Sequence, residues 1–144
     1  MKNPTPTELE RLARIAEAAA ARAADHIREW SGRHREVQSK DGSGSIASQV
    51  VTEVDLACQD IILTHLREES ALEGFGLLTE ESEDDSSRLE SDWFWCIDPL
   101  DGTLPFIENI PGYCVSIALA SRDAVPLLGA VHDPLTGRAY RATR

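Results

Sequence analysis

The first part of the chain places apolar residues at the three- and four-residue spacing of an amphipathic helix. Thr7 and Glu10 have the spacing of a capping box, so we expect this helix to start there and to end near Ser31–Gly32. A second capping-box spacing at Thr52–Asp55 predicts the start of a second helix. The two predicted apolar faces consist of Leu12, Ile15, Ala16, Ala19, Ala23, Ile27 and Trp30, and of Val54, Cys58, Ile61, Ile62 and Leu66. These faces predict that the two helices pack on each other.

The stretch between these helices, residues 32–49, is polar and includes the glycine- and serine-rich run Lys40–Ser45. This composition is typical of a mobile loop, so we expect a loop with at most one weak hairpin. Such a segment would suit a flap over an active site.

Beyond the second helix, the pattern changes to short apolar runs bounded by Gly, Pro, Asp and Ser, which is typical of strands. The runs are Leu77–Leu78, Trp93–Ile97, Cys114–Leu119, Val125–Val131 and a short one around Tyr140. Because helices come first and strands later, the sequence predicts an α+β fold with two long N-terminal helices packed on an antiparallel sheet. The length of 144 residues fits a single domain.

The chain is strongly acidic, with 14 Lys and Arg against 25 Asp and Glu and a formal net charge of −11. This charge would repel a nucleic-acid backbone or an anionic membrane, so we expect neither as a partner. The three cysteines lie far apart and form no CxxC pair, which favours a reducing, cytoplasmic location over a disulfide framework. The four histidines show no metal-ligand spacing, and we expect them at or near the surface.

The segment from Asp98 to Thr103 carries the candidate chemistry. Asp98 and Asp101 follow an apolar strand, and Gly102 and Thr103 stand where a helix is expected to begin. Carboxylates are hard oxygen donors suited to Mg²⁺, while free amides at a helix start can hold a phosphate. An acidic chain would repel phosphate unless bound cations reverse the local electric field. A phosphate site in this chain is therefore expected to need the neighbouring Mg²⁺ site. The alternative is that these residues form only two turns and a helix cap.

Two further acidic positions allow both a structural and a functional interpretation. Glu80 and Glu81 follow an apolar run, so they could share a metal with Asp98 at one edge of the sheet, or belong to a solvated loop. Asp55 could serve the site or only cap its helix.

The Asp-Gly-Thr-Leu sequence at 101–104 also resembles the haloacid dehalogenase superfamily, whose nucleophilic aspartate stands two residues before the Asp of this motif. That position is Pro99 here, and proline cannot act as a nucleophile. A covalent aspartyl-phosphate mechanism is therefore excluded.

Four segments in order resemble the inositol monophosphatase family of Mg²⁺-dependent, often lithium-sensitive phosphatases. They are Val51–Asp55, Leu78–Ser82, Trp95–Thr103 and Pro111–Ala118. The likeness covers nearly the whole chain, which resembles the N-terminal half of the family. It implies the N-terminal domain of a layered sugar-phosphatase fold, with residues 1–144 as a metal-binding domain and the family's C-terminal domain absent.

The resemblance also implies roles for individual residues. The metal ligands would be Glu80, Asp98, the backbone carbonyl of Leu100, and Asp101, with Glu80 also counted as catalytic. The family uses two or three Mg²⁺ ions, and the second site would be impaired here because a further metal-ligating Asp belongs to the family's other half.

The phosphate would be held by Gly102 and Thr103, beside Asp101, and the attacking water would be oriented by Asp55 and Thr103. Lys40 resembles the lysine of the family's mobile loop. Pro105 replaces a common Asn of the family, and proline is accepted in the first turn of a helix.

The expected reaction is direct hydrolysis of a small phosphate monoester by metal-activated water, with an inositol monophosphate ranked first. Nucleoside 3′(2′),5′-bisphosphates and sugar phosphates or bisphosphates remain alternatives within the family. Because members of the family are about twice as long, we expect either half of a phosphatase or a non-catalytic metal-binding or assembly module. A homo-oligomer is expected, with an apolar sheet face left exposed.

Overall fold

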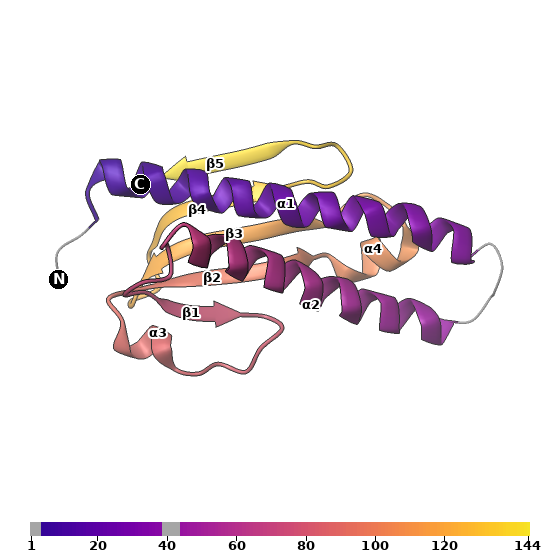
Figure 1. The fold of residues 1–144 in the computed structure, drawn as a ribbon, viewed down its shortest axis with the longest axis horizontal. Helices are drawn as coiled ribbons and strands as arrows, with labels where there is room; N and C mark the ends of the chain where they lie inside the picture. Colours follow the sequence, from indigo (N-terminus) through magenta and orange to yellow (C-terminus); the bar gives the residue numbers. More distant parts are fainter. Residues whose placement is uncertain (1–3, 39–43) are drawn as a thin grey trace.

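The computed structural model describes the backbone of residues 4–38 and 44–144. Figure 1 shows two long helices lying side by side along one sheet. The elements in chain order are α1 (Pro6–Gln38), α2 (Gly44–Glu68), β1 (Gly76–Thr79), α3 (Ser87–Glu90), β2 (Trp93–Asp101), α4 (Thr103–Glu108), β3 (Cys114–Ser121), β4 (Pro126–His132) and β5 (Ala139–Thr143). The predicted α+β class is confirmed, and so is each predicted strand.

Helix α1 begins at a capping box, two residues earlier than predicted. The backbone N–H of Thr5 donates to Glu8 Oε2 at 2.8 Å, and the N–H of Glu8 donates to Thr5 Oγ1 at 3.3 Å. The predicted apolar face lies against the sheet, and its alanines Ala16, Ala19 and Ala23 are fully buried. Because alanine side chains are small, α1 can lie close to the strands.

The predicted boundaries between the two helices were wrong. Helix α1 continues through Gly32 to Gln38, and α2 begins at Gly44 rather than near Thr52. A single glycine costs a helix only about 1 kcal/mol, which neighbouring turns can offset. The expected loop is therefore mostly helical, while Lys40 lies outside the described residues.

The strands form one sheet in the order β1-β2-β3-β4-β5. The β2–β3, β3–β4 and β4–β5 pairs are antiparallel, as predicted, but β1 pairs with β2 in parallel. The parallel pair arises because α3 lies in the connection and returns the chain to the start of the sheet. As a result, β1 and β2 end at the same edge of the sheet.

The core lies between the two long helices and one face of the sheet. Its largest fully buried side chain is that of Trp95, whose Nε1 donates to the carbonyl oxygen of Ala71 at 2.7 Å. The last strand is joined to the first helix by Arg141, which donates to Glu17 at 2.6 Å and to Glu10 at 3.0 Å. These charge-assisted bonds bring the two ends of the described chain together.

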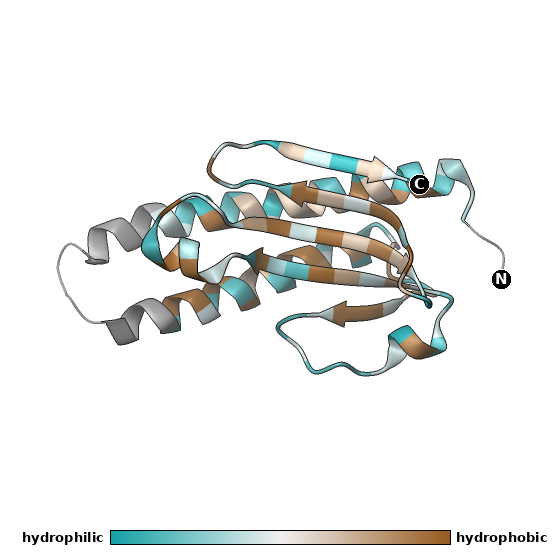
Figure 2. Cartoon of the chain, turned by 180° about the vertical axis from the view of Figure 1, so that it is seen from behind, coloured by the Kyte–Doolittle hydropathy of each residue, from teal (hydrophilic) through white to brown (hydrophobic). Residues whose placement is uncertain are grey.

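The opposite face of the sheet carries no long helix in the described structure; the short helix α3 packs against it at β1 (Figure 2). From β2 to β5, one row across this face consists of the paired residues Cys96, Ala118, Gly129 and Ala142. All four are small, and Cys96 and Ala142 are exposed. Ala118, Gly129 and Ala142 line a shallow apolar depression together with Pro126 and Leu127. We name this surface the open sheet face.

Two other sequence expectations can be compared with the structure. His65 and His132 are buried, at 5% and 7% exposure, so the expectation that the histidines lie near the surface was wrong for these two. None of the described helices is both long enough and apolar enough to cross a bilayer.

Candidate metal centre

A β-bulge in β2 places the two aspartates of the candidate motif on one face of the sheet. Asp98 pairs with Ser116, whereas Asp101 pairs with Cys114, so β2 holds one more residue than β3 between these pairs. Directly paired residues share a face, and Ser116 and Cys114 share one because they are two apart. Asp98 and Asp101 therefore share a face despite their odd spacing. Pro99, which cannot donate a ladder hydrogen bond, lies within the bulge.

The parallel pairing of β1 with β2 brings Glu80 to the same place. Thr79 pairs with Ile97, and the backbone N–H of Glu80 donates to the Ile97 carbonyl oxygen at 3.1 Å. Glu80 thus follows the end of β1 beside Asp98 on β2. The two acidic clusters meet at one edge of the sheet, which is the first of the two alternatives that the sequence left open.

Asp55 contributes a further carboxylate from α2. It lies in the interior of the helix, because α2 begins at Gly44, and its side chain is only 6% exposed. A helix-capping role is therefore wrong. The side chain instead lies close enough to Glu81, Glu80 and Asp98 for their charges to affect it.

Burial and mutual repulsion change the acidity of this cluster. Burial, followed by the charges of Glu81, Glu80 and Asp98, raises the pKa of Asp55 to about 7. Burial, a side-chain hydrogen bond with Glu80, and the charges of Glu80 and Asp101 raise the pKa of Asp98 to about 7. Burial and the Glu80 charge also raise the pKa of Glu81. Among the described residues, the charges that shift these pKa values all belong to acidic side chains, so the cluster concentrates negative charge.

The residues present fit a hard divalent cation. Asp55 Oδ1 and Asp98 Oδ1 are both buried atoms without a hydrogen-bond partner among the described residues, and buried polar atoms normally have one. Carboxylate oxygens are the ligands that Mg²⁺ prefers. Among the described residues, no three His, Cys, Asp or Glu side chains already stand together as a ligand set. Binding a cation would therefore require rotation of these carboxylates.

The turn after Asp101 is shaped by Gly102. This residue has φ +91°, in the left-handed region, and a Cβ placed on it would lie 2.3 Å from the Gly112 carbonyl oxygen. Only glycine satisfies both conditions. Gly102 is the N-cap of the short helix α4, whose first residue, Thr103, is exposed beside the acidic edge. The first amides of a helix have no intrahelical acceptor, so they are free for an anion.

The structure adds Gln59 and Cys114 to this site. Glu81, which the sequence had already grouped with Glu80, acts on Asp55 electrostatically. Gln59 lies one helical turn after Asp55 and is bonded to Ser82. Cys114 lies opposite Asp101 on β3, and burial and the charges of Asp101, Asp98 and Asp133 raise its pKa.

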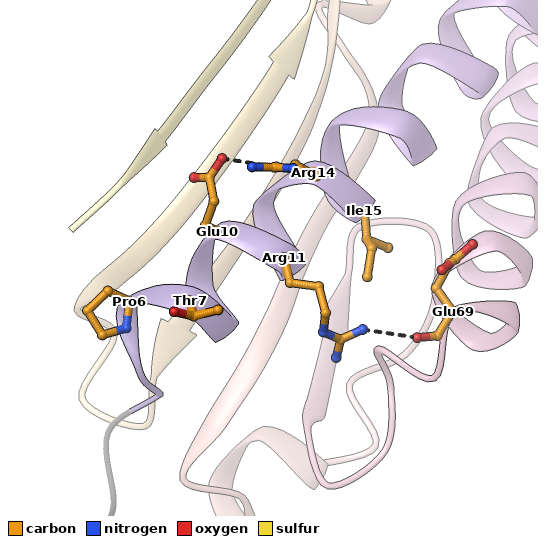
Figure 3. A pocket seen from close by; sticks show the side chains of 7 residues that line it. All are labelled: Pro6, Thr7, Glu10, Arg11, Arg14, Ile15 and Glu69. Atoms are coloured by element: carbon orange, nitrogen blue, oxygen red, sulfur yellow. Dashed lines mark hydrogen bonds and ion pairs between the residues drawn. The ribbon is translucent and has the colours of Figure 1, made fainter.

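A surface pocket of about 720 Å³ lies elsewhere, between the start of α1 and the end of α2 (Figure 3). Its two arginines are engaged by neighbours: Arg14 pairs with Glu10 at 3.2 Å, and Arg11 donates to the Glu69 carbonyl oxygen at 3.5 Å. The pocket shares no lining residue with the acidic edge. We therefore do not assign it to the candidate centre.

The fold and the acidic edge together define an α+β domain with a candidate metal centre at the end of its central strands. The chain belongs to the inositol monophosphatase family, whose model matches residues 8–144. It is 32% identical over 138 residues to an inositol-1-monophosphatase from Synechocystis, covering 96% of this chain and 45% of that protein. It is 35% identical over 133 residues to inositol monophosphatase 1 of Solanum lycopersicum, covering 92% of this chain and 46% of that protein.

A solved structure agrees with this assignment. The chain is similar to CysQ from Bacteroides thetaiotaomicron, a bacterial member of the family, with a TM-score of 0.73 and 30% identity, covering 92% of this chain and 45% of CysQ. The chain spans about half the length of the curated relatives that it matches.

Proposed function

We propose that residues 1–144 are the N-terminal, metal-binding domain of a Mg²⁺-dependent phosphatase that hydrolyses a small phosphate monoester. The observation that carries the proposal is the acidic edge, where Glu80, Asp98 and Asp101 meet beside the amides that begin α4. Membership of the inositol monophosphatase family supports the same chemistry. An inositol monophosphate is the first substrate to test, because the matched relatives include inositol monophosphatases.

The residues that would hold Mg²⁺ are Glu80, Asp98, Asp101 and the backbone carbonyl of Leu100. They supply carboxylate and carbonyl oxygens, which match the preference of this ion. When bound, Mg²⁺ would lower the pKa of a coordinated water and stabilise the negative charge that develops during hydrolysis. We expect more than one ion when the family's second half completes the site, and weaker binding of the second ion without it.

Asp55 and Thr103 would act on the attacking water. Asp55 Oδ1 is unpartnered and buried, so it can accept a hydrogen bond or a proton from that water. A pKa raised to about 7 suits a group that exchanges a proton near neutral pH. The hydroxyl of Thr103 is exposed at the same edge and would share the orienting role.

The phosphate would be held by backbone amides of Gly102 and Thr103, next to Asp101. The left-handed N-cap turns the chain so that the first turn of α4 begins directly after the acidic strand. Amides bind a phosphate without adding positive side chains, and none of the site residues described above is basic. The net charge of −11 would repel the substrate unless cations occupied the edge.

Substrate identity within the family is a finer part of the proposal. Nucleoside 3′(2′),5′-bisphosphates and sugar phosphates or bisphosphates are the alternatives, and we expect no nucleic-acid polymer or membrane partner. The free state of the three cysteines favours the cytoplasm.

The open sheet face favours a second role, in assembly. It presents a row of small residues and an apolar depression that no described element covers. We propose that this face mediates self-association, whether or not the chain is catalytic by itself.

The test is phosphate release by the 144-residue chain with and without Mg²⁺. The panel should contain inositol monophosphate, adenosine 3′,5′-bisphosphate and fructose 1,6-bisphosphate, with Asp101→Asn as the matched inactive variant. Mg²⁺-dependent release that this substitution abolishes would support the proposal. Calorimetric Mg²⁺ titration distinguishes a metal-binding half from a non-binding module, and absence of both release and binding would overturn the metal-centre assignment.

A further inference from the structure

Gln59 connects α2 to the acidic turn that follows β1. It lies one helical turn after Asp55 and is 8% exposed. Residues four positions apart lie on the same side of a helix, so Gln59 and Asp55 share one side of α2. The Gln59 side-chain amide donates from Nε2 to Ser82 Oγ at 2.7 Å. A buried side chain on the helix thus holds an exposed residue of the turn.

The same turn has a second anchor on the sheet. The backbone N–H of Glu80 donates to the Ile97 carbonyl oxygen at 3.1 Å, one residue before Asp98. Glu80 and Glu81 therefore lie between an attachment to β2 and an attachment to α2. The two attachments hold the pair of carboxylates close to Asp55 and Asp98.

The turn needs such an attachment because electrostatic repulsion acts against it. The charges of Glu81, Glu80 and Asp98 all act on Asp55, and Glu83, Asp84 and Asp85 continue the acidic run in exposed positions. Like charges favour movement of the turn away from α2. A neutral amide donating to a neutral hydroxyl opposes that movement without adding another charge. This accounts for a buried glutamine one turn away from a buried aspartate.

We propose that Gln59 is a positioning residue of the candidate metal centre, acting through Ser82 to hold Glu80 and Glu81 beside Asp55. The inference rests on the proposed function, because it concerns the arrangement of metal-binding carboxylates. Gln59 itself contacts neither metal nor substrate. Its effect is to reduce the movement that the carboxylates must make when Mg²⁺ binds.

The experiment measures the Mg²⁺ dissociation constant by calorimetry for the whole chain and its variants. Ser82→Ala removes the acceptor at an exposed position, and Gln59→Met removes the donor while keeping a side chain of similar length. We expect each to weaken Mg²⁺ binding about tenfold, as for other residues that orient metal ligands. The double variant should bind no more weakly than the weaker single variant, because both changes break one bond.

Two controls separate positioning from general damage. Ser82→Thr keeps the hydroxyl and should bind Mg²⁺ as the parent chain does. Ser87→Ala removes another serine from the same connection, one whose Oγ accepts the Leu77 N–H at 3.0 Å, and should leave the dissociation constant unchanged. The metal-free Ser82→Ala protein should still unfold cooperatively, with a melting temperature within a few degrees of the parent's, as expected for loss of about one hydrogen bond.

The measured dissociation constants decide whether Gln59 has a positioning role. If the parent binds Mg²⁺ and both Ser82→Ala and Gln59→Met bind equally well, the positioning role is overturned while the proposed function stands. If Ser82→Thr is as weak as Ser82→Ala, the hydrogen bond is not the cause and the role is also overturned. If the parent binds no Mg²⁺, the proposed metal centre fails, and this inference fails with it.

Discussion

Asp55 on α2 and Asp98 on β2 form a pair of like charges, each with a buried Oδ1 that lacks a hydrogen-bond partner. The charge of Asp98 contributes to raising the pKa of Asp55. The fold thus brings α2 and β2, which are far apart in the sequence, close enough for their carboxylates to repel each other. An arrangement that costs stability without a cation is typical of a binding site.

Replacement of Asp98 by Asn should stabilise the metal-free protein. The substitution keeps the shape of the side chain and removes a partly buried negative charge, so we expect a melting temperature higher by about 2–4 °C, equivalent to about 1 kcal/mol. Addition of excess Mg²⁺ should raise the melting temperature of the parent but not of the variant, because a ligand stabilises only the folded state that binds it. Scanning calorimetry measures both. A destabilised variant that still responds to Mg²⁺ would contradict this interpretation of Asp98.

Stability of the metal-free protein should fall as the pH rises from about 4 to about 7 and level off above that range. The pKa values of Asp55 and Asp98 are raised to about 7 in the folded protein, compared with about 4 in an unfolded chain. Between these values the folded state binds more protons than the unfolded state, so the free energy of unfolding decreases with pH.

Mg²⁺ should reverse much of this trend, since it binds the ionised carboxylates. Its stabilising effect should therefore be largest above pH 7 and decline below it. Urea unfolding at several pH values, with and without Mg²⁺, measures both effects. The Asp55→Asn/Asp98→Asn double variant provides the control, and its slope against pH should be smaller. An equal slope in parent and double variant would show that other groups cause the pH dependence.

Gly102→Ala should be more destabilising than an ordinary glycine substitution. A Cβ there would lie 2.3 Å from the Gly112 carbonyl oxygen and 2.9 Å from Tyr113 Cα. We expect a loss of about 3 kcal/mol or more, because backbone strain at positive φ adds to this overlap. Gly74→Ala is the matched control, since Gly74 also has positive φ but has no atom within 4 Å of a Cβ. Its cost should be about 1 kcal/mol, and equal losses in chemical denaturation would count against the proposed overlap.

Cys96 should report whether the open sheet face is covered. Cys96 is exposed on that face, whereas Cys58 is buried. A maleimide should therefore modify Cys96 before Cys58, and Cys96→Ala should remove the fast phase. If two copies associate through this face, the labelling rate should fall as protein concentration rises, in parallel with the mass from light scattering. A rate that stays constant while oligomers form would place the interface elsewhere.

Local sequence patterns predicted the strands well, because strand patterns depend on short-range features. The placement of Asp98 and Asp101 on the same face of the sheet could not be predicted from local sequence patterns. It depends on the bulge, and the bulge is defined by which residues of β3 lie opposite. The parallel direction of β1 likewise depends on how the connection through α3 returns to the sheet.

The predicted helix boundaries were wrong for a different reason. The glycine at 32 and the polar residues after it favour a loop locally, but the helix continues through them. The Thr52–Asp55 spacing resembled a helix start, although α2 begins eight residues before Thr52. Gln59 could be assigned only once the structure showed its bond to Ser82, because glutamine has many roles in a helix.

The bond between Arg141 and Glu17 has a consequence for folding during synthesis. Helix α1 is synthesised before β3, β4 and β5, the strands on which it packs. Until those strands leave the ribosome, the buried alanine stripe of α1 has no sheet to cover it. Such distant contacts slow folding and expose apolar surface to other proteins. The nascent chain should therefore depend on α2 or on a chaperone to shield α1 until the strands arrive.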